Sequence, residues 1–191
     1  MNRGHRRGRA SEPPPTGSAA HDTEPDPESV ARAIALRMLT GAPRSRAQLA
    51  EAMGRRDVPE EVAERVLDRF TEVGLVDDAA YAETLVRTRH AERGLSRRAL
   101  AVELRRKGVG DEDAERALEQ IDTEDEESAA RHLVRRRLAA TAGLDAQTRA
   151  RRTFAALGRK GYPPGLVARL VREELAADGL DTPPLTGVDP D

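Results

Sequence analysis

The chain has 191 residues, of which 38% are hydrophobic, 35% are charged and 2% are aromatic, and its formal net charge at pH 7 is -2. It contains no cysteine, which excludes structural disulfides, cysteine-ligated zinc and thiol catalysis. Its hydrophobic runs are far shorter than the roughly 20 residues of a membrane span. The basic N-terminus lacks the apolar segment of a signal peptide, so we expect a cytoplasmic protein.

Residue preferences predict an all-α fold. Alanine, leucine, arginine and glutamate lead the helix-propensity scale and are abundant, whereas runs of β-branched residues are missing. Residues 1–27 and 178–191 are rich in proline, glycine and charge, so both are predicted to be disordered tails. The core between them must be aliphatic, because the chain has only four aromatic residues: Phe70, Tyr81, Phe154 and Tyr162.

Three helices are predicted directly after the first tail. The first begins near Ser29 and ends before Gly41. Ser45 and Gln48 have the spacing of a capping box, in which each side chain binds a backbone N–H of the other residue, so a second helix starts there. Pro59 suits the first position of a third helix.

The same pattern then restarts twice. Gly74 closes the third helix, Asp77 can cap the fourth, and Gly94 ends it. Ser96 starts a fifth helix, which ends at Gly108, and an acidic sixth helix follows. In the last stretch Thr123 and Glu126 again have the spacing of a capping box and start a seventh helix. Gly143 breaks that helix, and Phe154 and Leu157 anchor the eighth.

An internal repeat underlies this restart. An offset of 51 residues places Ser45 on Ser96, and it also aligns apolar residues of the flanking helices without a gap. An offset of 53 residues places Lys107 on Lys160. We therefore predict three tandem three-helix units, which is close to the smallest number of repeats that buries a continuous core. The predicted boundaries are 28–74, 75–122 and 123–177.

Near-copies of one hexapeptide contain the only two lysines, LRRKGV at 104–109 and LGRKGY at 157–162. Each copy is predicted to end the second helix of its unit, with glycine in the left-handed conformation and the lysine near the negative end of the helix dipole. The first unit has MGRRDV at 53–58, where Asp57 replaces the expected glycine. The pattern leaves open whether that helix ends in the same way, and why lysine is used.

Basic side chains are the main candidates for partner contacts. Residues 108–128 are acidic and residues 131–175 are basic, and such segregation can steer a charged partner. A set of solvated helix faces would explain the same pattern. Guanidinium groups suit phosphates and carboxylates equally, so DNA and an acidic protein surface both remain open as partners. The candidate contact residues are Arg87, Arg89, Arg93, Arg97, Arg98, Arg105, Arg106, Lys107, Arg131, Arg135, Arg149, Arg152, Arg159 and Lys160.

Two segments of the second unit, GLVDDAAYA at 74–82 and RGLSRRALAVELRRKGV at 93–109, resemble the RecX family of bacterial recombination regulators. The resemblance extends more loosely over residues 29–175. It implies tandem three-helix repeats in an elongated, curved molecule that lies in the groove of a RecA–DNA filament. It further implies inhibition of RecA strand exchange, ATP hydrolysis and coprotease activity, and thus a role in DNA repair and the SOS response. The residues that match the family motif are Gly74, Leu75, Asp77, Asp78, Tyr81, Ala82, Gly94, Leu104 and Gly108.

Nothing in the sequence indicates an enzyme, a metal site or a cofactor. The four histidines lack metal-ligand spacing, and there is no glycine-rich phosphate loop. A helix-turn-helix DNA-binding regulator is the alternative, although the helix that would read the groove, DEDAERALEQI, is acidic. A helical scaffold is a third possibility. We expect a monomer whose contact with single- or double-stranded DNA, if any, is directed to phosphates and independent of sequence.

Overall fold

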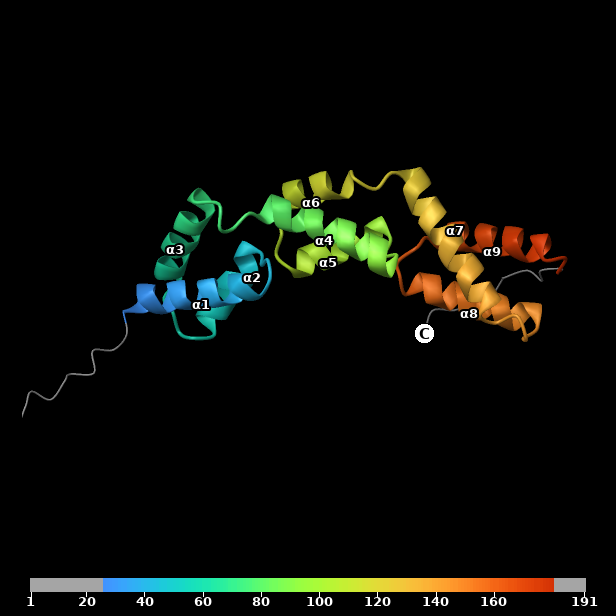
Figure 1. The fold of residues 1–191 in the computed structure, drawn as a ribbon, viewed down its shortest axis with the longest axis horizontal. Coiled ribbons are helices and arrows are strands. Elements are labelled where there is room, and N and C mark those ends of the chain that lie inside the picture. Colours follow the sequence, from blue (N-terminus) through green and yellow to red (C-terminus); the bar gives the residue numbers. More distant parts are fainter. Residues whose placement is uncertain (1–25, 181–191) are drawn as a thin grey trace, which may run out of the picture.

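The computed structural model describes residues 26–180, so most of the two predicted tails lies outside the described part of the chain. Within these residues there are nine helices and no strand, which confirms the all-α prediction. Figure 1 shows the helices in an extended row, with α1 at one end and α9 near the other. The helices are α1 (Pro27–Gly41), α2 (Arg46–Gly54), α3 (Glu60–Glu72), α4 (Asp78–Arg93), α5 (Arg97–Arg106), α6 (Asp111–Leu118), α7 (Thr123–Ala139), α8 (Ala146–Gly158) and α9 (Pro164–Ala177).

Side-chain caps at the predicted residues start several of these helices. Ser45 and Gln48 form the predicted capping box of α2, and Asp77 accepts a hydrogen bond of 2.8 Å from the Ala80 N–H at the start of α4. Ser96 caps α5 in the same way. Each such cap typically stabilises a helix by about 1 kcal/mol, because it satisfies a backbone donor that has no partner within the helix.

Three predicted helix starts are wrong by one or two residues. Helix α1 begins at Pro27, because the Asp26 carboxylate accepts from the Ser29 N–H. Pro59 is the N-cap of α3 and not its first helical residue. The cap of α7 is Asp122 and not Thr123, since its carboxylate accepts from the Asp125 N–H.

Each set of three helices surrounds its own aliphatic core. We call α1–α3 unit 1, α4–α6 unit 2 and α7–α9 unit 3, and every closely packed pair of helices lies within one unit. Met53, Leu104 and Leu157 occupy the same place in the three cores and are fully buried. Burial of one such side chain contributes about 1.5 to 3 kcal/mol. The repeat in the sequence is therefore a repeat of core positions.

The hexapeptides end α5 and α8 as predicted. Gly108 has φ 71° and Gly161 has φ 85°, both in the left-handed region that favours glycine. In each copy the N–H of the residue after the glycine donates to the carbonyl of the hexapeptide's leucine. The N···O distance is 3.2 Å from Val109 to Leu104 and 3.3 Å from Tyr162 to Leu157. This is the Schellman arrangement, which satisfies carbonyls that the helix leaves open. Asp57 has φ 58° and completes the same arrangement in unit 1, since aspartate tolerates this region better than most residues.

Candidate functional site

Unit 2 meets unit 1 through the hexapeptide that ends α5, at a contact we call the first junction. The fully buried Ser45 hydroxyl, at the start of α2, donates to the Lys107 carbonyl. Asp78 of α4 accepts a hydrogen bond of 2.8 Å from the Arg46 N–H. A Cβ on Gly108 would overlap with Ala47, so only glycine allows the backbones to approach this closely. The contact is small, polar and sterically exacting.

Unit 3 meets unit 2 through the corresponding residues, at the second junction. The Ser96 N–H, at the start of α5, donates a hydrogen bond of 3.0 Å to the Lys160 carbonyl. Glu126 of α7 accepts a hydrogen bond of 2.8 Å from the Arg97 N–H. A Cβ on Gly161 would lie 2.6 Å from the Ser96 hydroxyl oxygen. The two junctions thus use equivalent serines and lysines, although the Lys107 carbonyl accepts from a hydroxyl and the Lys160 carbonyl from a backbone N–H. In both, a carboxylate of the following unit accepts from the first N–H of the preceding unit's second helix.

The two junctions explain the hexapeptide more fully than the helix cap does. Lys160 places its ammonium group on the Arg93 carbonyl, at the negative end of α4, and not on the end of its own helix. A compact ammonium group on a flexible stem suits that reach across the junction. Asp57 is exposed and meets no preceding unit in the described part of the chain, so a side chain is tolerated there. The glycine is required where units dock.

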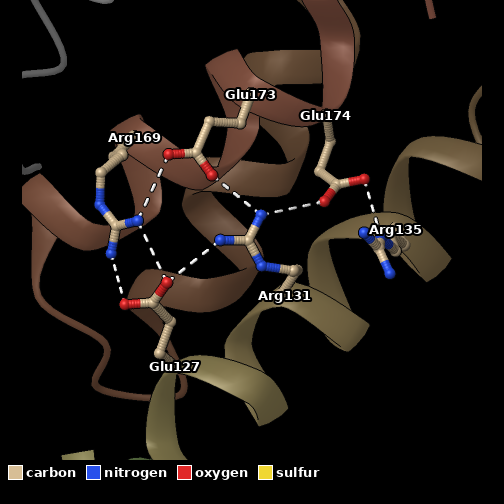
Figure 2. Close-up of polar contacts among 6 residues, drawn as sticks. All are labelled: Glu127, Arg131, Arg135, Arg169, Glu173 and Glu174. Carbon is tan, nitrogen blue, oxygen red and sulfur yellow. Dashed lines mark hydrogen bonds and ion pairs between the residues drawn. The ribbon is translucent and has the colours of Figure 1, made fainter. Parts of the chain in front are cut away.

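Several predicted contact residues are occupied by ion pairs inside unit 3. Figure 2 shows Arg131 between three carboxylates, with distances of 3.1 Å to Glu127, 2.8 Å to Glu173 and 3.3 Å to Glu174. Arg135 binds Glu174 at 2.8 Å. Hydrogen bonds from arginines hold the pKa values of all three carboxyl groups below their usual range. These arginines link α7 to α9 and have little free charge to offer a partner.

Arg149 of α8, which was a candidate contact residue, is buried. Its side chain is only 7% exposed and forms an ion pair of 3.0 Å with Asp178. It also donates a hydrogen bond of 3.3 Å to the Leu138 carbonyl. The helix is turned so that this residue faces the end of α9, and Arg149 therefore has a structural role in unit 3.

Two further candidates also bind groups of the protein itself. Arg89 forms an ion pair of 3.1 Å with Glu103, and the Arg97 side chain donates a hydrogen bond of 3.0 Å to the Ile121 carbonyl. The first links α4 to α5, and the second links α5 to the end of α6. The structure leaves Arg87, Arg105 and Arg152 exposed, away from the clefts described next.

The remaining candidate cations gather in two clefts beside the second junction. One cleft has a volume of about 1020 Å³ and the other of about 760 Å³. Arg93 and Arg159 line both, so the two clefts meet at these side chains. We call the joined surface the basic trough, and its seven cations are Arg93, Arg98, Arg106, Lys107, Arg136, Arg159 and Lys160.

Positive charge predominates in the basic trough. None of its seven cations has a carboxylate partner within 4.0 Å in residues 26–180. Three carboxylates line it, but Glu103 is bound to Arg89, which leaves Glu92 and Asp125. The pKa of Lys160 is lowered, chiefly by burial and further by the neighbouring arginine charges. The trough is therefore a surface on which cations repel one another and an anion would be stabilised.

The family-motif residues mostly shape unit 2 and its junctions. Asp77 caps α4, Asp78 binds across the first junction, and Ala82 and Leu104 are fully buried. Tyr81 is half-buried, and that burial raises its pKa. The glycines Gly74, Gly94 and Gly108 all have positive φ, whereas Leu75 is 50% exposed.

Sequence reasoning missed Arg136 and the contacts across both junctions. Arg136 lies in an arginine run, and no local pattern shows which member of the run faces a cleft. Two further searches cover the described residues only: no cluster of histidine and carboxylate side chains there could hold a metal ion, and no helix there could cross a membrane.

These features define a helical-repeat protein that consists of three-helix units joined end to end, with an open cationic surface across one junction. Family models for the first, second and third three-helix domains of RecX match residues 31–70, 77–118 and 124–171. The chain belongs to the RecX family of regulatory proteins.

Relatives agree with this assignment over nearly their whole length. The regulatory protein RecX of Thermobifida fusca is 55% identical over 88% of this chain and 89% of its own. The regulatory protein RecX of Streptomyces coelicolor is 54% identical over 87% of this chain and 90% of its own length. The crystal structure of RecX from Lactobacillus salivarius has a TM-score of 0.67 with 20% identity, over 78% of this chain and 96% of that one, and shows the shared fold.

Proposed function

We propose that this chain binds RecA recombinase filaments and inhibits RecA strand exchange, ATP hydrolysis and coprotease activity. Its membership of the RecX family, over all three units, is the observation that carries this proposal. The protein acts in the cytoplasm as a monomer, in DNA repair and the SOS response.

The shape of the molecule supports a partner that is itself extended. Three small bundles lie in a row, as in Figure 1, and together present a long surface. Both junctions consist of a few hydrogen bonds at glycine contacts, so the row keeps one register without a large apolar interface. A long surface with unpaired arginines suits the repeated subunits and bound DNA of a filament.

The helix-turn-helix alternative is not favoured. In unit 2 the helix in the recognition position is α6, which has only eight residues and carries Asp111, Glu112 and Asp113 in its first turn. The N-terminal residues of a recognition helix contact base edges in the major groove, where DNA phosphates would repel three carboxylates. A sequence-specific footprint on duplex DNA would revive this alternative.

The proposal is tested by titrating the protein into RecA that hydrolyses ATP on single-stranded DNA. Hydrolysis is expected to fall at a protein concentration equal to or below that of RecA. A second ATPase that depends on the same DNA serves as a control and should stay active, because the target is the filament. Unchanged RecA hydrolysis over the full titration, or equal loss in the control enzyme, would refute inhibition through the filament.

A further inference from the structure

The basic trough is a charged surface whose seven cations have no carboxylate partner in the described residues 26–180. The arginines that join α7 to α9 are neutralised by carboxylates, as Figure 2 shows. In the trough, by contrast, Arg93, Arg136 and Arg159 are exposed and have no ion pair within residues 26–180. Their arrangement is maintained by the second junction, because they come from α4, α7 and the end of α8.

We infer that the basic trough binds the phosphate groups of a nucleic-acid backbone directly, without the recombinase. This binding lies beyond the proposed action on RecA filaments and can be tested without any filament. The ligand lies across the second junction and contacts units 2 and 3 together.

The distribution of charge indicates an extended polyanion. The seven cations line two clefts that meet at Arg93 and Arg159, so a single compact anion would contact only some of them. A nucleic-acid strand carries one negative charge per nucleotide and supplies a continuous series of acceptors. Forked guanidinium groups bind such phosphate oxygens well. An acidic protein segment would need a comparable run of carboxylates.

The lining of the trough predicts recognition without sequence preference. Tyr162 is the only phenylalanine, tyrosine or tryptophan in its lining, and at 3% exposure it cannot stack on a base. The other rings are the imidazoles of His90 and His132. Proteins that stack bases present exposed rings, whereas contacts to phosphates carry no direct sequence information. Binding should therefore depend on phosphate number and on salt.

The test compares two triple variants of the full chain. The trough variant has Arg93→Gln, Arg136→Gln and Arg159→Gln. The matched control has the same loss of charge in unit 1, at three exposed arginines that also lack an ion pair in the described residues: Arg37→Gln, Arg56→Gln and Arg65→Gln. None of the six side chains takes part in a junction hydrogen bond, so circular dichroism should show the parent's helicity in both variants.

Binding is measured by fluorescence anisotropy of a labelled 20-nucleotide single strand of mixed sequence, over a series of salt concentrations. The trough variant should bind about 10- to 100-fold more weakly at low salt, and the slope of log affinity against log salt should fall by about 2, since roughly 0.7 counterion is released per phosphate contact on a single strand. The control should bind like the parent. Competition with inorganic triphosphate distinguishes a nucleic-acid strand from a small polyphosphate. We expect triphosphate to displace the labelled oligonucleotide only when its concentration is far above that of the oligonucleotide.

Three other outcomes overturn the inference, and a fourth overturns the proposed function instead. Equal losses in both triple variants mean that overall charge, and not the trough, attracts DNA. Displacement by triphosphate at the oligonucleotide's own concentration identifies a small polyphosphate as the ligand and rules out the strand. If the parent binds neither ligand yet inhibits RecA, and the trough variant does not inhibit RecA, the trough recognises an acidic protein surface. A RecA assay without inhibition but with trough-dependent DNA binding would refute only the proposed function.

Discussion

Replacing Gly161 by alanine is expected to separate unit 3 from unit 2 without unfolding either. The new Cβ would lie 2.6 Å from the Ser96 hydroxyl oxygen and 2.8 Å from Ala99 Cβ, both closer than atoms can approach. Because Ala99 belongs to a helix and cannot turn away, the second junction must open. The positive φ adds a backbone cost of about 1 to 2 kcal/mol.

A distance measurement between spin labels reads out this opening directly. The chain contains no cysteine, so Glu83→Cys in α4 and Arg151→Cys in α8 give two unique labelling sites, both exposed. The parent should give a narrow distance distribution and the Gly161→Ala variant a broad one. Gly179→Ala is the matched control, because Gly179 has φ 73° but has nothing within 4 Å of an added Cβ. A distribution that Gly161→Ala leaves narrow would contradict the assigned geometry of the junction.

Charge reversal on α5 and its end is expected to abolish most of the inhibition of RecA. The variant combines Arg98→Glu, Arg105→Glu and Lys107→Glu, which replaces three positive charges on α5 and its C-terminal end by negative ones. Arg98 and Lys107 line the trough, and Arg105 is exposed on the same helix. At least tenfold more protein should be needed for half-inhibition of ATP hydrolysis, equivalent to about 1.4 kcal/mol of binding free energy.

Its control reverses the same number of charges in unit 1, with Arg37→Glu, Arg56→Glu and Arg65→Glu. This variant separates contact at α5 from a general effect of net charge. Far-ultraviolet circular dichroism checks that both variants keep the parent's helix content. Full inhibition by the α5 variant, with unchanged helicity, would show that this side of unit 2 does not face the filament.

Local patterns in the sequence predicted the helices and their repetition, because caps and core residues act over short distances. Ser45 and Ser96 start helices through their own turn, and the leucines 51 residues apart fill equivalent cores. The left-handed glycine that ends a helix is likewise a local feature. Even Asp57 follows the local rule, since its backbone takes the conformation that the position requires.

Contacts between units could not be predicted in the same way. Asp78 and Glu126 look like ordinary residues at helix starts, yet each binds an N–H of the preceding unit. The burial of Arg149 depends on how α8 is turned against α9, which no local pattern in the sequence indicates. Likewise, the trough exists only because the second junction brings α4, α7 and the end of α8 together.

Cosedimentation with RecA filaments tests the proposed function most directly. Filaments are assembled on single-stranded DNA with a non-hydrolysable ATP analogue and then pelleted with the protein. We expect the protein to pellet with these filaments, to stay in solution with RecA that lacks nucleotide and DNA, and to show only salt-sensitive retention on DNA alone. A protein that stays in the supernatant with assembled filaments, while its helicity is intact, would contradict the account.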